Sequence, residues 1–438
     1  MNVIFGEILM INSIEIENLF GRFDYLISTK TGGITIITGP NGFGKSTILR
    51  IINALSKGNL EYFLRLDFSS LIIDFDNREK ISIQKTGKKI VIDNVQLPFF
   101  SEEHQDYIRF AQRRPWIQRV PDGFIDRRTD EFFTEDEYFY HMYFLDDDRY
   151  LERYGNKKEH QVMLELKKKF DQIREWCGEV RFISDQRLIR TNLKRSDEPQ
   201  VIDVIRELPQ RLKIQISKVA EEYSRVANTL DSSYPKRLFA AEEGIKDQKE
   251  YRARLDEANE KFEKLNEYNL VDMSIIDEKN YKQAYSTALK IYFDDFAEKY
   301  KVFQNLISKL DLFTKIINNR LTFKHIRITR DNGFEIVDND NPKKILQLSQ
   351  LSSGEKQEIV LFYDLIFDSK EKLLLLIDEP EISLHITWQK KFLDDLLEVS
   401  KQTEMQVIVA THSPQVVSKH LDIQIDLGEL YGEKLNTK

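Results

Sequence analysis

A run of glycines, one lysine and two hydroxyl residues stands between a short β-branched stretch and a segment of helical character. The run GPNGFGKST, residues 39–47, fits the spacing G-x-x-x-x-G-K-[ST] at every position. Its glycines let successive backbone N–H groups turn towards a phosphate, and the helix that follows adds its positive dipole end. The pattern predicts a phosphate-binding loop made of Gly39, Pro40, Asn41, Gly42, Phe43, Gly44, Lys45, Ser46 and Thr47.

Two side chains of this loop suit the charged parts of a nucleotide. The Lys45 ammonium is predicted to reach the β- and γ-phosphates, and the Ser46 hydroxyl to ligate Mg²⁺. We therefore predict ATP and Mg²⁺ as cofactors. The alternative is a chance glycine turn, and the strand before the loop and the helix after it argue against that.

Adjacent carboxylates follow a continuous apolar run, LLLLI, at residues 373–377. Such a run is typical of a central strand in a parallel sheet, whose two faces are both covered. Asp378 at its end is predicted to complete the Mg²⁺ shell through water, and Glu379 to act as the general base that polarises the attacking water. For Glu381 we favour a solvated acid at the start of a helix.

A histidine ends another apolar run, VIVATHSP, at residues 407–414. A lone histidine is more often structural than functional. At the end of a core strand beside a nucleotide site, however, His412 is suited to sense a γ-phosphate. We predict it as a catalytic residue together with Glu379 and Lys45.

The stretch LSSGEKQ, residues 351–357, resembles the signature sequence L-S-G-G-Q of ABC-type ATPases, with serine at 353 and glutamate at 355 as departures. The motif order also matches: phosphate loop, signature, acidic strand end, histidine. In that family two ATPase heads pack head-to-tail, and ATP lies between the phosphate loop of one and the signature of the other. The resemblance implies that a nucleotide on a second copy is contacted by Ser352, Ser353, Gly354 and Glu355.

The same family places a glutamine near Mg²⁺ and the nucleophilic water. The best match is Gln186 in RFISDQRLIR, just past an expected strand. The alternative for this residue is an ordinary polar position in a loop.

The spacing of the motifs indicates which branch of the ABC-type ATPases the chain resembles. The gap from Thr47 to Leu351 is 351 − 47 = 304 positions, too short for the coiled-coil arms of SMC proteins. The chain more closely resembles the AAA/ABC ATPases of bacterial anti-phage defence, which include the ATPase subunits of the PARIS, Septu and retron systems. That resemblance implies head-to-tail dimers within a larger homo-oligomer, a separately encoded nuclease or toxin effector, and a phage-encoded trigger.

Two other functions stay open. One is an SMC-like ATPase of DNA repair or chromosome maintenance that clamps DNA directly, and the other is an ATP-sensing scaffold with almost no turnover. Basic residues at 112–128 and 187–195 leave direct nucleic-acid binding undecided. For the first stretch we weigh a protein interaction surface, a solvated loop and a nucleic-acid contact.

The composition limits the class of protein. The formal net charge is −8, so a basic face that binds nucleic acid would have to be local, and a single cysteine excludes a disulfide framework. The first 20 residues lack a basic leader region, and no apolar run approaches the ~20 residues that span a bilayer. We expect a soluble cytoplasmic protein without a membrane partner and without a nuclease centre of its own.

These residues require a scaffold, and the fold class that we predict is α/β: an ABC-type P-loop ATPase head with a helical insertion. The predicted domains are an N-terminal ATPase lobe at 1–200 with an insertion near 101–150, a helical insertion at 201–318, and a C-terminal ATPase lobe at 319–438. In the middle segment apolar heptads are not sustained, which favours a short helical hairpin or bundle over a coiled coil. Strands are expected at 11–20, 22–27, 33–39, 70–76, 80–85, 179–184, 323–329, 333–338, 373–377 and 406–411, with a helix from about 384.

Overall fold

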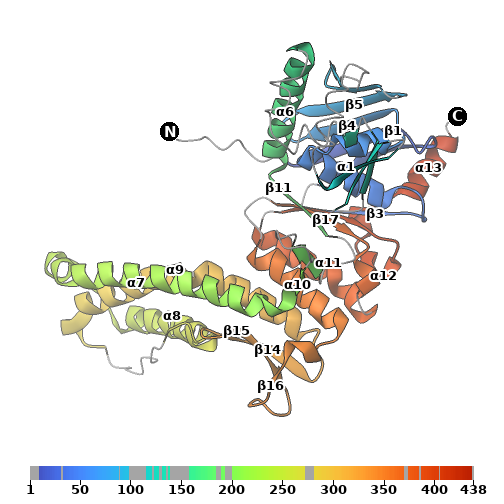
Figure 1. Ribbon diagram of the computed structural model, residues 1–438. Helices are drawn as coiled ribbons and strands as arrows, with labels where there is room; N and C mark the ends of the chain where they lie inside the picture. Colours follow the sequence, from blue (N-terminus) through green and yellow to red (C-terminus); the bar gives the residue numbers. More distant parts are fainter. Residues whose placement is uncertain are drawn as a thin grey trace. The chain divides into compact units, whose positions relative to one another are not determined.

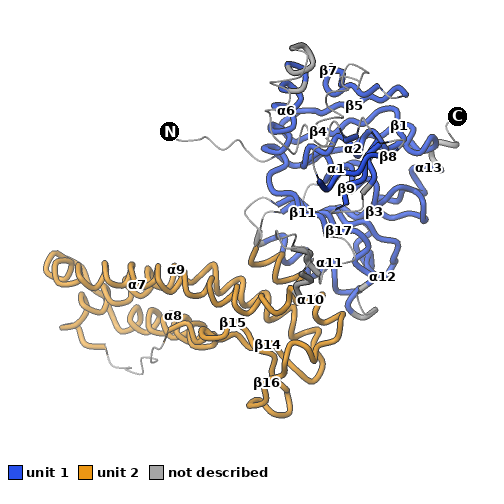
Figure 2. Tube along the Cα trace, viewed as in Figure 1, with its two compact units in different colours: residues 1–185, 370–438 blue, residues 186–369 orange. Residues whose placement is uncertain are grey.

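The chain divides into two compact units, coloured separately in Figure 2. Unit 1 comprises Met1–Asp185 and Lys370–Lys438, and unit 2 comprises Gln186–Ser369. The computed structural model describes residues 9–30, 33–87, 89–97, 115–120, 123–127, 131–134, 137–138, 157–183, 189–192, 200–271, 281–368, 373–383, 386–403 and 405–436. Most of the predicted insertion near 101–150 lies outside these residues.

A five-stranded parallel sheet forms the centre of unit 1 (Figure 1). Its strands, in spatial order, are β11 (Glu179–Ile183), β17 (Leu373–Asp378), β18 (Gln406–Ala410), β3 (Ile34–Thr38) and β19 (Gln424–Asp426). All residues of β3, β17 and β18 are buried, as the continuous apolar runs predicted. The described residues of unit 1 include the helices α1 (Lys45–Lys57), α2 (Leu60–Arg65), α6 (Lys157–Cys177), α11 (Ile386–Thr403), α12 (Pro414–Val417) and α13 (Leu427–Asn436).

An antiparallel sheet forms the second layer of unit 1, in the order β2-β1-β4-β5-β6-β7. The strands are β1 (Ile11–Leu19), β2 (Phe23–Ser28), β4 (Ser70–Phe75), β5 (Lys80–Thr86), β6 (Lys89–Ile92) and β7 (Val95–Gln96). Ile14 and Ile16 are buried whereas Glu15 and Glu17 are exposed, so the alternation in the sequence identified the core face correctly.

Three short strands from the predicted insertion join the same core. They are β8 (Ile117–Val120), β9 (Gly123–Asp126) and β10 (Glu131–Thr134), which pair antiparallel. Phe124, Phe133 and Tyr138 are at most 2% exposed and belong to the hydrophobic cluster that also contains residues of α1, α6 and the antiparallel sheet. The described part of this stretch therefore contributes side chains to the core of unit 1.

Unit 2 contains a helical bundle, seen in Figure 1 as α7, α8 and α9. These helices are α7 (Leu208–Ala240), α8 (Gln248–Glu267) and α9 (Ser286–Asn318). Near the end of α7, the Arg237 guanidinium donates to the buried Asp295 carboxylate in the first third of α9 at 2.7 Å. Asp231, earlier in α7, pairs at 2.7 Å with Lys299, later in α9. The two helices are therefore antiparallel, and the prediction of a short helical bundle is confirmed.

The rest of unit 2 carries the signature stretch. It contains α10 (Ser353–Phe367) and an antiparallel sheet of β14 (Lys324–Thr329), β15 (Gly333–Asp338) and β16 (Ile345–Leu346). A separate pair consists of β12 (Ile189–Asn192) and β13 (Gln200–Asp203). In the described residues of both units, 3₁₀ turns form at Val204–Arg206, Gln283–Tyr285, Leu348–Gln350, Pro380–Ser383 and Leu421–Ile423.

A buried ion pair connects the end of α9 to α10. Arg320 Nε lies 2.9 Å from Glu358 Oε2, and both side chains are 2% exposed. The guanidinium carbon also lies 4.5 Å from the centre of the Phe362 ring. Two opposite charges at this depth stabilise each other, and removing either one leaves the other as a buried charge that has lost its ion-pair partner.

Among the described residues, no helix combines the length and the hydrophobicity that crossing a bilayer requires.

The ion pair leads to a prediction about stability. Replacing Glu358 by Ala should lower the free energy of unfolding of unit 2 by about 3–5 kcal/mol, because the Arg320 charge stays buried. The double replacement Glu358→Ala with Arg320→Met should recover part of this loss. Denaturant titration of the full chain, followed by circular dichroism, measures both changes, and a double variant less stable than Glu358→Ala would contradict the argument.

Candidate functional site

Polar segments meet at one edge of the parallel sheet in unit 1. Ala410 in β18 pairs with Asp378 in β17 on one side and with Ile37 in β3 on the other. Because these strands are parallel, the residues after each pairing position emerge at the same edge. The phosphate-loop sequence, the carboxylates after β17 and His412 after β18 therefore come together, although they are far apart in the sequence.

Glycine is favoured at two positions of the loop by the backbone conformation, and at one of them also by the lack of space for a side chain. Gly42 and Gly44 have φ values of 85° and 90°, in the left-handed region that favours glycine. A Cβ atom on Gly44 would lie 2.9 Å from Leu19 Cδ2, whereas one on Gly42 would meet nothing within 4 Å. Gly44 is the N-cap of α1, so the loop turns directly into a helix start, whose N–H groups and dipole favour an anion.

Lys45 and Ser46 occupy the first turn of α1. The Lys45 ammonium donates to the carbonyl oxygens of Gly39 at 2.9 Å and Pro40 at 3.2 Å, and the residue is 5% exposed. The Ser46 hydroxyl donates to Asp378 Oδ1 at 2.8 Å. A hydroxyl and a carboxylate side by side are the hard oxygen donors that Mg²⁺ prefers, with phosphates and waters completing its shell. The donor set therefore fits a magnesium nucleotide.

Aromatic residues that we did not predict hold the phosphate loop at Phe43. The Tyr25 hydroxyl donates to the carbonyl oxygen of Phe43 at 3.0 Å, and burial raises the pKa of Tyr25, which keeps the proton on this hydroxyl. The Phe43 ring packs 5.0 Å from Phe23 and 5.9 Å from Tyr431 in α13, measured between ring centroids. Elements from both ends of the chain thus hold the tip of the loop.

The carboxylates after β17 lie around His412. Glu379 Oε2 is 3.5 Å from His412 Nδ1, and Glu381 Oε1 is 3.1 Å from the same nitrogen. Glu379 has a φ of 46°, which is uncommon for a residue other than glycine, and its N–H donates to the Ala410 carbonyl at 2.9 Å. Residues held in such a conformation tend to occur at functional sites, where the surrounding structure compensates the strain.

The interpretation of Glu381 as a solvated acid is wrong. This residue is 7% exposed, and its Oε1 accepts hydrogen bonds from the Thr411 hydroxyl at 2.7 Å and from the His412 N–H at 2.9 Å. The 3₁₀ turn Pro380–Ser383 is what brings it back against the end of β18. The neighbouring sequence could not indicate this burial, because the hydrogen-bond partners of Glu381 are 30 and 31 positions away.

The signature stretch begins α10 in unit 2. Ser352 is the N-cap: its hydroxyl accepts from the Glu355 N–H at 3.3 Å, and its own N–H donates to Glu355 Oε2 at 2.8 Å. Ser353 and Gly354 form the first turn of the helix, and Leu351 before them is buried. The reciprocal pair is a capping box, which fixes the helix start through its own side chains.

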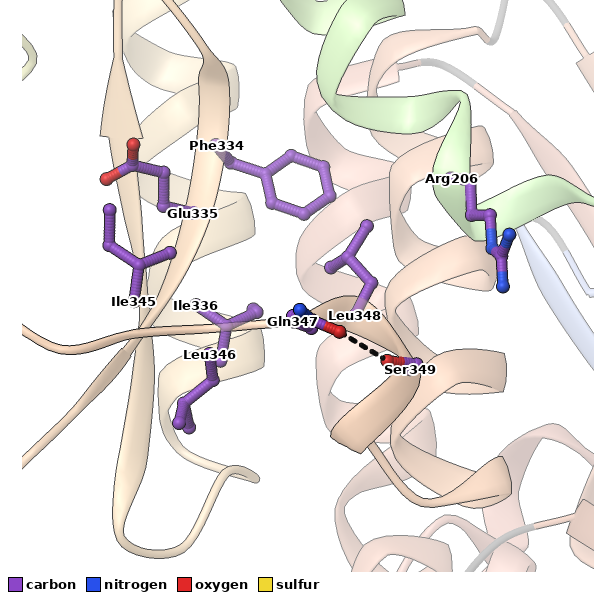
Figure 3. Close-up of a pocket in the computed structure, with 9 residues that line it drawn as sticks. All are labelled: Arg206, Phe334, Glu335, Ile336, Ile345, Leu346, Gln347, Leu348 and Ser349. Carbon is purple, nitrogen blue, oxygen red and sulfur yellow. Dashed lines mark hydrogen bonds between the residues drawn. The ribbon is translucent and has the colours of Figure 1, made fainter.

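A cavity of about 440 Å³ lies beside this stretch in unit 2 (Figure 3). Its lining is Arg206, Phe334, Glu335, Ile336, Ile345, Leu346, Gln347, Leu348 and Ser349. The Ser349 hydroxyl donates to Gln347 Oε1 at 3.3 Å, within the turn that leads into Leu351. The cavity and the predicted site residues share no residue, so the phosphate chemistry is not assigned to it.

One predicted site residue cannot be located. Gln186, three positions after β11, lies outside the described residues, and its role near Mg²⁺ stays a prediction. Asn41 is in the loop after β3, and Thr47 is in the first turn of α1.

Comparison with known proteins agrees with the motif pattern. UvrABC system protein A of Clostridium acetobutylicum is 40% identical over 91 residues, which are 20% of this chain and 9% of that protein. A probable iron chelatin transport ATP-binding protein of Helicobacter pylori is 33% identical over 73 residues, 17% of this chain and 28% of that protein. The similarity thus spans well under a third of each relative.

Among solved structures, the Smc head domain of Pyrococcus furiosus, bound to the C-terminal domain of ScpA, is similar with a TM-score of 0.37 and 14% identity. The alignment covers 96% of this chain and 93% of that one. The model of the AAA ATPase domain family matches residues 10–417, which include every motif described above. The chain therefore belongs to the AAA ATPase domain family.

Proposed function

We propose that this ATPase binds ATP with Mg²⁺ at the sheet edge of unit 1 and hydrolyses it in a head-to-tail dimer. The observation that carries the proposal is the convergence of Lys45, the Ser46–Asp378 pair, Glu379 and His412 at that edge. Unit 2 supplies the signature helix start, which would face the nucleotide of a second copy. A catalytic site completed by a partner makes hydrolysis depend on dimerisation.

Each side chain has a distinct task in this proposal. Lys45 neutralises phosphate charge, and Ser46 and Asp378 hold the metal, which when bound supplies charge stabilisation to the phosphates. Glu379 accepts a proton from the attacking water, for which its side chain, 27% exposed, is accessible.

Glu381 is a positioning residue for His412. With two carboxylates facing Nδ1, the imidazole ring is held through that nitrogen, and Nε2 is the ring nitrogen left to contact a γ-phosphate. The same Glu381 oxygen also binds the backbone N–H of His412, so the ring and its main chain are fixed together. His412 is 49% exposed on its side chain, which lets it approach a γ-phosphate.

We further propose that the ATPase cycle controls a separately encoded nuclease or toxin effector in anti-phage defence, within a larger homo-oligomer. The support is the resemblance of the motif set, from LSSGEKQ to DEPE and ATHSP, to defence ATPases. The direct DNA clamp is the second candidate, and six of the nine basic residues in the two stretches that would serve it lie outside the described residues.

A Glu379→Gln variant tests the dimer. Removing the general base should lower the hydrolysis rate by about 10²–10⁴-fold while leaving the phosphate contacts of Lys45 and Ser46 intact. The variant should therefore bind ATP and accumulate as a dimer, which analytical ultracentrifugation with and without ATP detects.

Adding Lys45→Ala to this variant is the matched control and should abolish both binding and dimerisation. A Glu379→Gln protein that binds ATP and stays monomeric would overturn the head-to-tail proposal. If the wild-type protein accumulates as an ATP-bound dimer to the same extent as Glu379→Gln, this would instead favour the ATP-sensing scaffold with almost no turnover.

A Glu381→Gln variant tests the positioning role. The amide retains the shape of the carboxylate but replaces one acceptor oxygen by an NH₂ donor and removes the charge that faces Nδ1. We expect kcat to fall by about tenfold or more with the dissociation constant for ATP changed by less than about threefold. A His412→Ala change should then have little further effect in the Glu381→Gln background, and additive losses would show that the two residues act separately.

The two candidate roles differ in their response to DNA. A defence ATPase that acts through an effector should hydrolyse ATP at a rate changed by less than about twofold by duplex DNA, whereas a DNA clamp should be stimulated and lose that stimulation as salt rises. Steady-state rates at several salt concentrations measure this. Strong, salt-sensitive stimulation would contradict the defence role proposed above.

A further inference from the structure

The signature stretch contains a charge that opposes its proposed task. A triphosphate on a second copy would have to approach the start of α10, where the N–H groups and the helix dipole favour an anion. Glu355, at the third position of that helix, places a carboxylate in the same turn. An uncompensated carboxylate would repel the incoming phosphates.

The compensating charge comes from β14. The Lys324 ammonium lies 3.0 Å from Glu355 Oε2, the oxygen that also accepts the Ser352 N–H at 2.8 Å. The side chains are 17% and 12% exposed, so the pair is partly shielded from water and from salt. The same carboxylate oxygen of Glu355 thus accepts the capping hydrogen bond from Ser352 and forms the ion pair with Lys324 of β14.

The neighbouring acid on the sheet does not compete for this lysine. Lys324 is paired across the sheet with Asp338 in β15. The Asp338 carboxylate, however, accepts from the Lys344 ammonium at 3.2 Å and from the Asp340 N–H at 3.0 Å. Lys324 of β14 and Lys344, which directly precedes β16, therefore have separate partners, and of these two Lys324 is the one paired with the signature.

We propose that Lys324 is a positioning residue that neutralises Glu355, so that the signature can receive the nucleotide held by a second copy. This inference rests on the proposed function. Glu355 then acts as a helix cap whose charge is balanced within its own chain, and the phosphates meet only the dipole and the N–H groups of the helix start. The pair makes a glutamate usable where the family sequence has glutamine.

The test is a double-mutant cycle in the Glu379→Gln background, with the dimer dissociation constant in ATP measured by analytical ultracentrifugation. Lys324→Met should weaken dimerisation by about tenfold or more, since the Glu355 charge is then uncompensated. Adding Glu355→Gln to Lys324→Met removes the uncompensated carboxylate and restores the net charge of the pair, so it should return the dissociation constant to within about threefold of the parent's. The defect of Lys324→Met should also shrink as salt rises.

The matched control is Lys344→Met, which removes the lysine directly before β16 whose partner is Asp338, and it should leave dimerisation unchanged. Binding of a fluorescent ATP analogue to monomers reports on unit 1 and should be equal in all variants. If Lys324→Met dimerises normally, or if adding Glu355→Gln does not restore its dimerisation, the inference is wrong while the proposed function stands. If the parent forms no dimer with ATP, the proposed function fails and the inference falls with it.

Discussion

The pairing of β18 with β17 on one side and β3 on the other is the constraint on which the candidate site depends. A shift of one residue in either pairing would turn alternate side chains to the other face of the sheet. It would also move Asp378 along the edge, away from the Ser46 hydroxyl that donates to it at 2.8 Å. The buried residues of these strands therefore do more than fill the core, because their packing sets the register that aligns the polar ends.

The same register explains why Glu379 adopts an uncommon backbone conformation. Its N–H is bound by the carbonyl of Ala410, the residue opposite Asp378, so the chain is still held to β18 one position beyond the strand. A φ of 46° then turns the chain sharply into the 3₁₀ turn that buries Glu381. The strain at 379 and the burial at 381 are consequences of one turn, and both bring a carboxylate to His412 Nδ1.

The sequence predicted what depends on local pattern. The loop at 39–47, the continuous apolar runs that became β3, β17 and β18, and the helical bundle were all identified from spacing and periodicity. Contacts between distant positions were not predicted: Tyr25 with Phe43, Glu381 with Thr411, and Lys324 with Glu355. A carboxylate or a lysine has the same local signature in solvent and in a buried pair, because only the partner distinguishes them.

The helix starts predicted to contact phosphate, one in each unit, are satisfied in different ways. At α1 the N-cap is Gly44, which has no side chain, so its first N–H groups depend on water or on a bound anion. At α10 the capping box of Ser352 and Glu355 meets part of the same requirement from within the chain. In the proposed dimer, the start of α10 would meet a nucleotide only when two copies associate, so it has to remain folded between encounters, and side-chain caps provide that. The capping carboxylate brings a charge unfavourable to phosphate, and a lysine 3.0 Å away is the simplest way to keep the cap while removing the repulsion.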